Sequence, residues 1–503
     1  MVDFFLAISP IVAVLIILFV LRQSIVRAGI AGCLLALVIA ISYFKLKSDE
    51  VLFPFIKGTL TTSSVAYFLL FGIFLFHLMN ERGVIRSFAA IVAKSTHDPV
   101  RQVLILAVAF SPLVESASGF GLAAIVICPI LIALGFRPVQ AIIISLISLS
   151  AVPWGSLAAG TVIGSDLAHL DPQNLGTGTA LLSLPIFAYF AIIMTIIADG
   201  WKGLKRRWFE VLLTSGTLGL SVWAFNAFVG VELAGVFGAL STLGVELAVI
   251  RFVTRREVDQ QAESEIGAAL AQEENFGKLK SLSPYLFLIG MLLFSRLVPG
   301  VAEVLKTHAV LSLPTYQFTF PFLYSPGFFL ILVCIFTIWI FGIKQETITK
   351  SMKQTWIHWY PVIVSTLLFV IMSEMMSLSG MTQVLSQTAA ETFGSAFLYI
   401  TPLIGGLGGF LAGSNTGSNS MFIKMQVQTA HQLGLSEQLA AYSQNASSSH
   451  LIMANPSKVV LGASIGGVRE QESALLKRML LVGFGTVTII GIELVVIRIV
   501  GWM

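Results

Sequence analysis

Two polar clusters interrupt the apolar stretches of this sequence and carry most of the groups that could bind a small solute. The first runs from 115 to 121 and the second from 414 to 419. Hydroxyl and carboxamide groups hydrogen-bond a polar solute without placing a fixed charge in lipid, and glycines let the backbone approach it closely. The residues that we expect to contact a substrate are Ser116, Ser118, Gly119, Gly121, Ser414, Asn415, Thr416, Gly417, Ser418 and Asn419. A contact between Ser- and Gly-rich helices is the alternative explanation of either cluster.

Two ionisable residues lie in or close to these clusters. Glu115 follows Leu113 and Val114. Burial in such apolar surroundings penalises the charged form of a carboxyl, so we expect Glu115 to carry a proton across the membrane. The alternative is a side chain that caps a helix and never titrates. Lys424 lies just beyond the second cluster. It could pair with a substrate carboxylate, pair with Glu115, or extend to the outer membrane interface.

Other polar residues lie within apolar stretches. His77 and Glu374 fall near the ends of predicted helices, where we expect interfacial water to solvate them. A later helix is unusually polar, and we expect it to line an aqueous path opposite the second cluster. Its polar residues are Asn445, Ser447, Ser448, Ser449, His450, Asn455 and Lys458.

We expect no metal, no cofactor and no enzyme active site. Each of the three cysteines lies alone in an apolar run: Cys33, Cys128 and Cys334. The acidic and histidine side chains of one predicted outer loop lack further ligands at metal-binding spacing: Asp166, His169 and Asp171. Phosphate-loop, zinc-protease and nucleophile-elbow motifs are also missing from the sequence. A membrane-embedded enzyme remains the alternative from another functional class.

The amino-acid composition indicates whether these clusters lie in water or within a membrane. Of the 503 residues, 56% are hydrophobic and 11% are charged, and the mean hydropathy is +0.89. Soluble domains carry about 25% charged residues. A soluble protein could not bury this much apolar surface, so the chain is predicted to cross a membrane many times. The net charge of +4 is too small a basic excess to indicate nucleic acid as a partner.

Apolar stretches long enough to span a bilayer are frequent. They lie at about 4–22, 28–45, 61–80, 174–200, 209–229, 231–252, 284–300, 325–344, 357–378 and 478–500. Residues 253–283 form a polar linker. The regions 102–165 and 397–466 are apolar but broken by Ser, Gly, Asn and Pro. Because lipid cannot satisfy the backbone groups of a broken helix, such breaks must be buried in protein or line a wet cavity.

The two broken regions resemble each other in sequence. Residues 113–119 align with 411–417, and Gly160–Gly164 aligns with Gly462–Gly466. This order and spacing indicate an internal repeat, with chance similarity as the alternative. We expect two re-entrant hairpins, at about 102–135 and 397–432, each followed by a broken helix.

Positive charges give the orientation. The basic loops fall in the cytoplasm if the N-terminus lies outside, and the two repeats then have opposite topology. The expected fold is all-α, with about twelve transmembrane helices plus the two hairpins and with both termini outside. Its parts are N-terminal helices (1–60), a first repeat (61–200), connecting helices (201–356) and a second repeat (357–503).

At the two clusters the sequence resembles the L-lactate permease family of bacterial inner-membrane transporters. The similarity is carried by residues 113–121, 134–138, 413–419, 428–434 and 469–470. It is collinear over most of the chain but dense only in these blocks. The resemblance implies symport of lactate, glycolate and similar 2-hydroxy monocarboxylates with protons. The wider superfamily of carboxylate carriers also has hairpin tips in inverted repeats.

The sequence departs from the family pattern at several positions. The first cluster usually reads Glu-Gly-Ala-Ala-Gly-Phe-Gly, whereas this chain adds hydroxyls at Ser116 and Ser118. The second usually reads Gly-Ser-Asp-Thr, whereas this chain has Asn415. Lys424 is not part of the expected pattern, and the chain is short for the family. A different carboxylate or a different coupling ion therefore stays open.

The combined expectation is a secondary active transporter that imports lactate or glycolate by proton symport through a bacterial inner membrane. A sodium-coupled carrier of di- or tricarboxylates is the alternative within the transport class. A second carboxylate would require a second fixed cation, and Lys424 is the only cation among the expected binding residues. The expected partners are the carboxylate, protons or sodium, and the bilayer, and a homodimer stays open.

Overall fold

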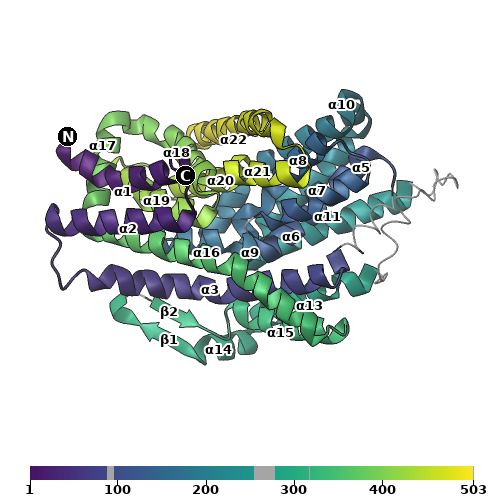
Figure 1. Ribbon diagram of the computed structural model, residues 1–503, viewed down its shortest axis with the longest axis horizontal. Coiled ribbons are helices and arrows are strands. Elements are labelled where there is room, and N and C mark those ends of the chain that lie inside the picture. The colour runs from purple at the N-terminus through teal and green to yellow at the C-terminus, as the bar shows by residue number, and fades with distance from the viewer. Residues whose placement is uncertain (86, 88–95, 120, 254–277, 317, 502–503) are drawn as a thin grey trace.

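The computed structural model describes residues 1–85, 87, 96–119, 121–253, 278–316 and 318–501 (Figure 1). The all-α prediction is confirmed, because nearly all of these residues are helical. Most of the predicted polar linker 253–283 falls on residues 254–277, outside the described residues.

The helices follow one another along the whole chain. They are α1 (Val2–Phe19), α2 (Ile25–Ser42), α3 (Leu52–Glu81), α5 (Pro99–Val103), α6 (Ser111–Ser118), α7 (Leu122–Ala133), α8 (Pro138–Ile147), α9 (Gly155–Ala168), α10 (Pro172–Phe228), α11 (Val231–Val253), α13 (Lys278–Leu297), α14 (Pro299–Thr307), α15 (Pro326–Ile340), α16 (Gln345–Leu378), α17 (Met381–Phe393), α18 (Phe397–Ala412), α19 (Asn415–Gln432), α20 (Glu437–Leu451), α21 (Pro456–Ile465) and α22 (Glu472–Val500). Short π or 3-10 segments are η1 (Leu104–Phe110), η2 (Leu149–Trp154), η4 (Pro314–Tyr316), η5 (Gly394–Ala396), η6 (Ile452–Ala454) and η7 (Arg469–Gln471).

Several helix starts follow directly from local sequence. Asp171, Ser325 and Asn455 each precede a proline and accept a hydrogen bond from a backbone N–H in the first turn of α10, α15 and α21. Such a cap satisfies N–H groups that the helix leaves unpaired, and proline at the first position has no N–H to satisfy. These starts therefore need no tertiary contact to be specified.

Among the described residues, eight helices are long and apolar enough to cross a membrane, or up to ten if each of two bent pairs is one span. Part of the difference from the expected twelve lies in α10. It continues through the predicted runs 174–200 and 209–229 as one element, with non-helical backbone at Asp199, Gly200 and Arg207. The predicted runs 4–22 and 325–344 correspond to α1 and α15, which are apolar but shorter.

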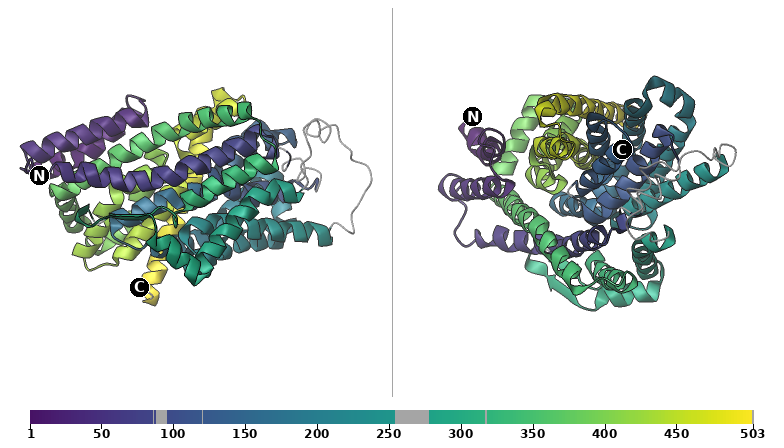
Figure 2. Two further views of the ribbon diagram at one scale, coloured as in Figure 1. Left: turned by 90° about the horizontal axis from the view of Figure 1, so that it is seen from below. Right: turned by 45° about the vertical axis from the view of Figure 1, so that its right-hand side comes forward.

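The helices α3 and α16 lie side by side and run in opposite directions (Figures 1 and 2). Near the start of α3, Lys57 lies 3.8 Å from Glu374, close to the end of α16. At the other end of α3, Glu81 accepts a hydrogen bond of 2.9 Å from Gln354, close to the start of α16. Between them, the Trp359 indole donates to the Ala66 carbonyl at 2.9 Å.

The helices are interrupted where the sequence predicts breaks. In the first half, α6 ends at Ser118 and α7 begins at Leu122, and η2 separates α8 from α9. In the second half, α18 ends at Ala412 and α19 begins at Asn415, and η6 separates α20 from α21. Each half thus holds a pair of helices around a short turn, which we call its tip, followed by a broken helix.

A short β-hairpin was not expected from the sequence. Strand β1 (Val310–Leu313) pairs antiparallel with β2 (Phe318–Pro321). The Tyr67 ring of α3 contacts Phe320 and Phe322 edge to face, with ring centroids 6.0 Å apart in each pair. The hairpin therefore packs against α3 through aromatic rings.

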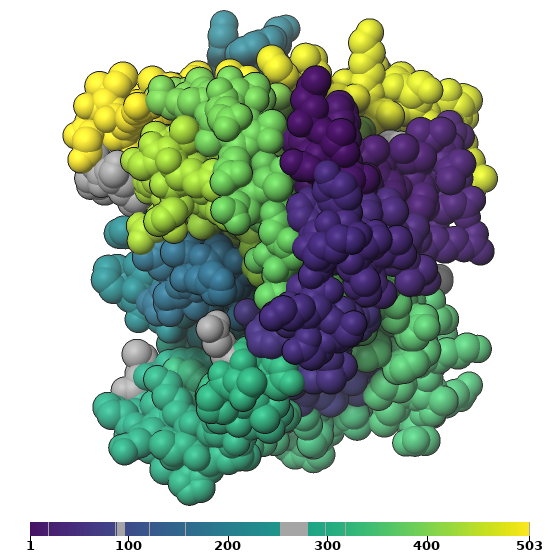
Figure 3. All heavy atoms as spheres, turned by 90° about the vertical axis from the view of Figure 1, so that its left-hand side faces the viewer, coloured from purple at the N-terminus to yellow at the C-terminus, as the bar shows by residue number. Residues whose placement is uncertain are grey.

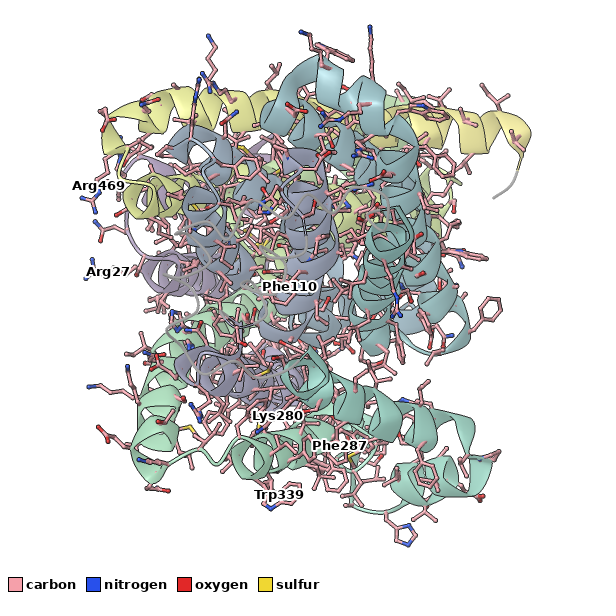
Figure 4. All side chains as sticks on the ribbon, turned by 90° about the vertical axis from the view of Figure 1, so that its right-hand side faces the viewer. Arg27, Phe110, Lys280, Phe287, Trp339 and Arg469 are labelled. Carbon is pink, nitrogen blue, oxygen red and sulfur yellow. The ribbon has the colours of Figure 1, made fainter. Side chains whose placement is uncertain are left out.

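Large apolar side chains cover the outside of the helical bundle. Trp339 is 74% exposed, Leu481 72% and Phe484 67%, as suits a surface that faces lipid rather than water. Figure 3 shows α1 and α2, in purple, beside the green segment that contains α17. In Figure 4, Arg27 and Arg469 lie at the edge of the molecule, whereas Phe110 lies among the packed helices.

Candidate functional site

The first tip is held by the side chain of Glu115. Its Oε1 accepts a hydrogen bond of 3.0 Å from the Gly121 N–H, which stands at the start of α7. Gly119 and Gly121 have φ angles of 68° and 80°, which only glycine adopts readily. Glu115 is fully buried, and within the described part of the chain its Oε2 has no hydrogen-bond partner. One carboxyl oxygen thus caps the helix while the other remains available.

The second tip presents the start of α19. Gly413 turns the chain with a φ angle of 62°, and Ser414 caps the helix by accepting a hydrogen bond of 3.4 Å from the Gly417 N–H. The first N–H groups of a helix carry a partial positive charge and attract anions. The start of α19 therefore suits a carboxylate.

The two tips line the same small cavity, whose volume is about 20 Å³. Glu115 and Gly121 contribute from the first tip, and Ser414, Asn415 and Thr416 from the second. The remaining lining residues are Val152, Gly155, Ala159, Gly160, Gly413 and Ile452. A cavity needs about 10–15 Å³ to hold one water molecule, so in this conformation the tips are nearly closed on each other.

Asn445 of α20 organises the second tip. Its Oδ1 accepts hydrogen bonds from Asn415 at 2.8 Å and from Asn419 at 2.9 Å. Its Nδ2 donates to Thr161 of α9 at 3.1 Å and to Thr179 of α10 at 2.8 Å. A carboxamide can make four such bonds, so this buried side chain is fully satisfied. Asn445 therefore ties α19 and α20 to helices of the first half.

Asn455 supports the second tip from behind. Its Nδ2 donates to the Phe410 carbonyl at 2.8 Å, near the end of α18. Its Oδ1 accepts from the N–H groups of Ser457 at 3.1 Å and Lys458 at 3.3 Å, at the start of α21. One side chain thus satisfies backbone groups at the end of one helix and at the beginning of another.

The structure separates the predicted binding residues into two groups. Gly121, Ser414, Asn415 and Thr416 line the cavity together with Glu115. The other predicted residues are not among those that line the cavity. Three of them carry hydroxyl groups, and each of these hydroxyls contacts a neighbouring helix or its own backbone. Ser116 lies against Gly235 of α11, Ser118 donates to the Val114 carbonyl at 2.6 Å, and Ser418 packs against Gly408.

Three further predicted residues serve the geometry of the tips. Gly119 forms the turn of the first tip, and Gly417 faces Ala412 and Phe369. Asn419 donates at 3.0 Å to the Gly160 carbonyl. A Cβ atom at Gly160 would lie 2.6 Å from the Asn415 amide nitrogen, so the glycine allows α9 to approach α19. The role of Gly160 as the opposing surface is visible only in the fold.

Lys424 has a partner that the sequence did not suggest. Its ammonium pairs with Glu374 at 2.8 Å, neither with Glu115 nor with the membrane interface, and its side chain is 11% exposed. Lys57 lies 3.8 Å from the same carboxyl oxygen. Two lysines sharing one buried carboxylate connect α19 to α16 and α3.

The interfacial placement of Glu374 and His77 was wrong. Both are buried, with 5% and 4% exposure, because α3 and α16 pack along their whole length. The Nε2 of His77 lies 3.1 Å from the Nδ1 of His358.

Lys458 was expected to line the aqueous path and was not among the residues expected to bind substrate. The structure places its ammonium against Gly121 at the first tip, and the N–H of the same glycine binds the Glu115 carboxyl. The alignment of the repeats could not find this contact, because the two residues belong to different halves of the chain.

Metal ligands do not gather in the described part of the chain: no group of three or more His, Cys, Asp or Glu could hold an ion there. What the site offers chemically is a buried carboxyl, a nearby ammonium and the starts of two helices around one cavity. These groups suit a small anion and a proton.

Comparison with known proteins points the same way. The family model for L-lactate permease matches residues 3–323 and 314–501. The chain is 26% identical to the glycolate permease GlcA of Escherichia coli K12, over 94% of this chain and 91% of that protein. It is 27% identical to the L-lactate permease of Streptococcus iniae, over 86% and 91%.

The chain shares its fold with a transporter whose structure has been solved. The YdaH transporter of Alcanivorax borkumensis, described as having an unusual topology, superposes with a TM-score of 0.55 over 95% of this chain and 99% of that one. The two sequences are 13% identical, so the likeness concerns the fold alone.

Proposed function

The chain belongs to the L-lactate permease family, and from this premise we propose that it imports lactate or glycolate by proton symport. Its family is one of permeases, so the chain is a multi-pass membrane transporter of lactate-like carboxylates and not an enzyme. The proton as coupling ion, the inward direction and the bacterial inner membrane are parts of the proposal.

The environment of Glu115 is the observation that carries proton coupling. Its Oε1 is fixed by the Gly121 N–H, while its buried Oε2 has no partner among the described residues and the side chain lines the cavity between the tips. A carboxyl in this position can gain or lose a proton at Oε2 without losing its hold on the backbone. Its neutral form crosses a low-dielectric region at much lower free energy than its charged form.

Inverted repeats with re-entrant hairpins would give this site access to each side in turn. Three observations support that part of the proposal: the antiparallel α3 and α16, the tips that follow them, and the broken helices after each tip. Both chain ends lie in the left half of Figure 1, in keeping with termini on one side of the membrane.

Purified protein in proteoliposomes tests the proposal directly. An imposed pH gradient, acidic outside, should drive accumulation of labelled L-lactate or glycolate above equilibrium, because each entering anion brings a proton. A protonophore should abolish the accumulation. Uptake that follows a sodium gradient instead, or that prefers a dicarboxylate, would refute the proton-coupled monocarboxylate assignment.

The tip hydroxyls should contribute to substrate affinity. Ser414→Ala and Thr416→Val should each weaken L-lactate binding by about 1–3 kcal/mol, the usual effect of leaving a buried polar partner unpaired. Binding of labelled lactate to the detergent-purified protein measures the change, with Ser48→Ala on an exposed turn as the control. Equal losses in the control would indicate general destabilisation.

Orientation can be tested with single cysteines. The three native cysteines are buried, and a variant lacking them provides the background. Ser48 and Gln471 are exposed. A membrane-impermeant maleimide should label Ser48→Cys in right-side-out vesicles and Gln471→Cys only in inverted ones. Labelling of both from the same face would contradict the proposed topology.

A further inference from the structure

Lys458 links the two halves of the site. Its backbone N–H is bound by Asn455, whose amide also holds the end of α18 behind the second tip. Its side chain extends to the first tip, where a Cβ atom on Gly121 would overlap the ammonium. Lys458 therefore reaches from the second half of the chain to the turn that Glu115 caps.

The ammonium of Lys458 lies in a mostly positive environment, with one carboxylate beside it. Lys458 lies in the first turn of α21, and its ammonium lies at the start of α7. Both are helix ends with partial positive charge. Glu115 is the carboxylate beside this ammonium, because its Oε1 accepts a hydrogen bond from the N–H of the same Gly121 that the ammonium lies against. The site thus balances one cation against one carboxylate.

We propose that Lys458 is the substrate-binding cation, and that a substrate carboxylate takes the place of ionised Glu115 as its partner. This inference rests on the proposed function. When the anion enters, two carboxylates face one ammonium in a buried site, where an unpaired charge is strongly unfavourable. Glu115 then takes up a proton at Oε2, and the site again holds one cation and one anion.

Charge balance also sets the stoichiometry and the class of substrate. One proton binds for each monocarboxylate because each brings one negative charge. A dicarboxylate would bring a second negative charge. None of the described residues that line the cavity is a cation, and Lys458 is the ammonium that lies against one of them, Gly121. Lys424 is already engaged with Glu374. The arrangement therefore selects acids with a single carboxylate.

The test combines binding with proton uptake. Titrating weakly buffered, detergent-purified wild type with L-lactate, above the pH at which Glu115 loses its proton, should consume about one proton per lactate bound. Glu115→Gln should bind lactate with no proton uptake. Lys458→Met should weaken lactate binding by roughly 10- to 100-fold, the loss of a charge-assisted hydrogen bond. Lys458→Arg should retain most of the affinity, and Lys477→Met on exposed α22 serves as the matched control.

The outcomes separate the inference from the proposed function. Wild-type affinity in Lys458→Met would overturn the role of Lys458. The same proton uptake in Glu115→Gln as in wild type would overturn the exchange of Glu115 for the substrate carboxylate. Either result leaves lactate transport in place. If Lys458→Met does not fold, Lys458→Gln takes its place: lactate binding should weaken by the same roughly 10- to 100-fold, and wild-type affinity would overturn the role of Lys458. A wild-type protein that neither binds nor transports lactate or glycolate would instead refute the proposed function.

Discussion

Replacing Glu115 by Gln is expected to abolish uphill accumulation of lactate while preserving exchange of lactate across the membrane. The amide keeps the size of the side chain, and its oxygen can still accept the hydrogen bond from the Gly121 N–H. It cannot bind or release a proton near neutral pH. The site is then permanently in the state that accepts an anion, so movement of substrate no longer requires a proton.

Two assays on the same proteoliposomes distinguish these activities. Accumulation is measured under an imposed pH gradient, and exchange is measured with labelled lactate outside and unlabelled lactate inside. Glu470→Gln, at an exposed position, is the matched control and should behave as wild type in both. Accumulation by a well-folded Glu115→Gln protein at the wild-type level would rule out Glu115 as the proton carrier.

Introducing one methyl group at Gly409 is expected to separate α18 from α20. A Cβ atom there would overlap the Ser448 carbonyl oxygen and lie 2.6 Å from the carbonyl carbon of the same residue. These are backbone atoms, so no side chain can rotate away, and the helices must move apart. We expect Gly409→Ala to lower the free energy of unfolding by about 3 kcal/mol or more, at the upper end of overpacking effects.

Substrate binding should suffer in the same variant. The Ser448 hydroxyl donates a hydrogen bond to Asn415, so moving α20 withdraws a partner from the second tip. The midpoint of thermal unfolding in detergent and lactate binding measure the two effects. Gly491→Ala in α22 is the control, because nothing lies within 4 Å of the added methyl group and alanine favours a helix. Equal unfolding midpoints for the two variants would contradict this account of the packing.

The positions of the tips and of the helix breaks were predictable because they depend on local chemistry. Glycines at 119, 121 and 413 adopt positive φ angles, and Asn455 with Pro456 starts a helix whatever packs against it. These interruptions are easy to recognise in the sequence, because membrane-spanning segments are almost entirely apolar and the breaks are polar. The location of the candidate site was therefore predictable from sequence, and the geometry at that location supports the proposal.

The direction of individual side chains was not predictable in the same way. Ser116 and Thr416 look alike in sequence, yet one packs against α11 and the other lines the cavity. Which face of a helix meets which neighbour depends on packing between segments far apart in the chain. The same reason explains why the pairing of Lys424 with Glu374 was not among the alternatives considered for it, and why Lys458 was not counted among the binding residues.

The bonds of Asn445 have a consequence for how space for a substrate can arise. Together with the close approach of Gly160 to Asn415, they fasten α9, α10, α19 and α20 into one block. The first tip shares the cavity with this block through Glu115 and Gly121 but has no hydrogen bond with Asn445 among the described residues. Widening the cavity by displacing the second tip would break several buried hydrogen bonds at once, whereas displacing the first tip would leave them intact. Two tips that look equivalent in sequence are therefore held unequally: the Asn445 bonds tie the second tip to helices of both halves of the chain, and they do not include the first tip.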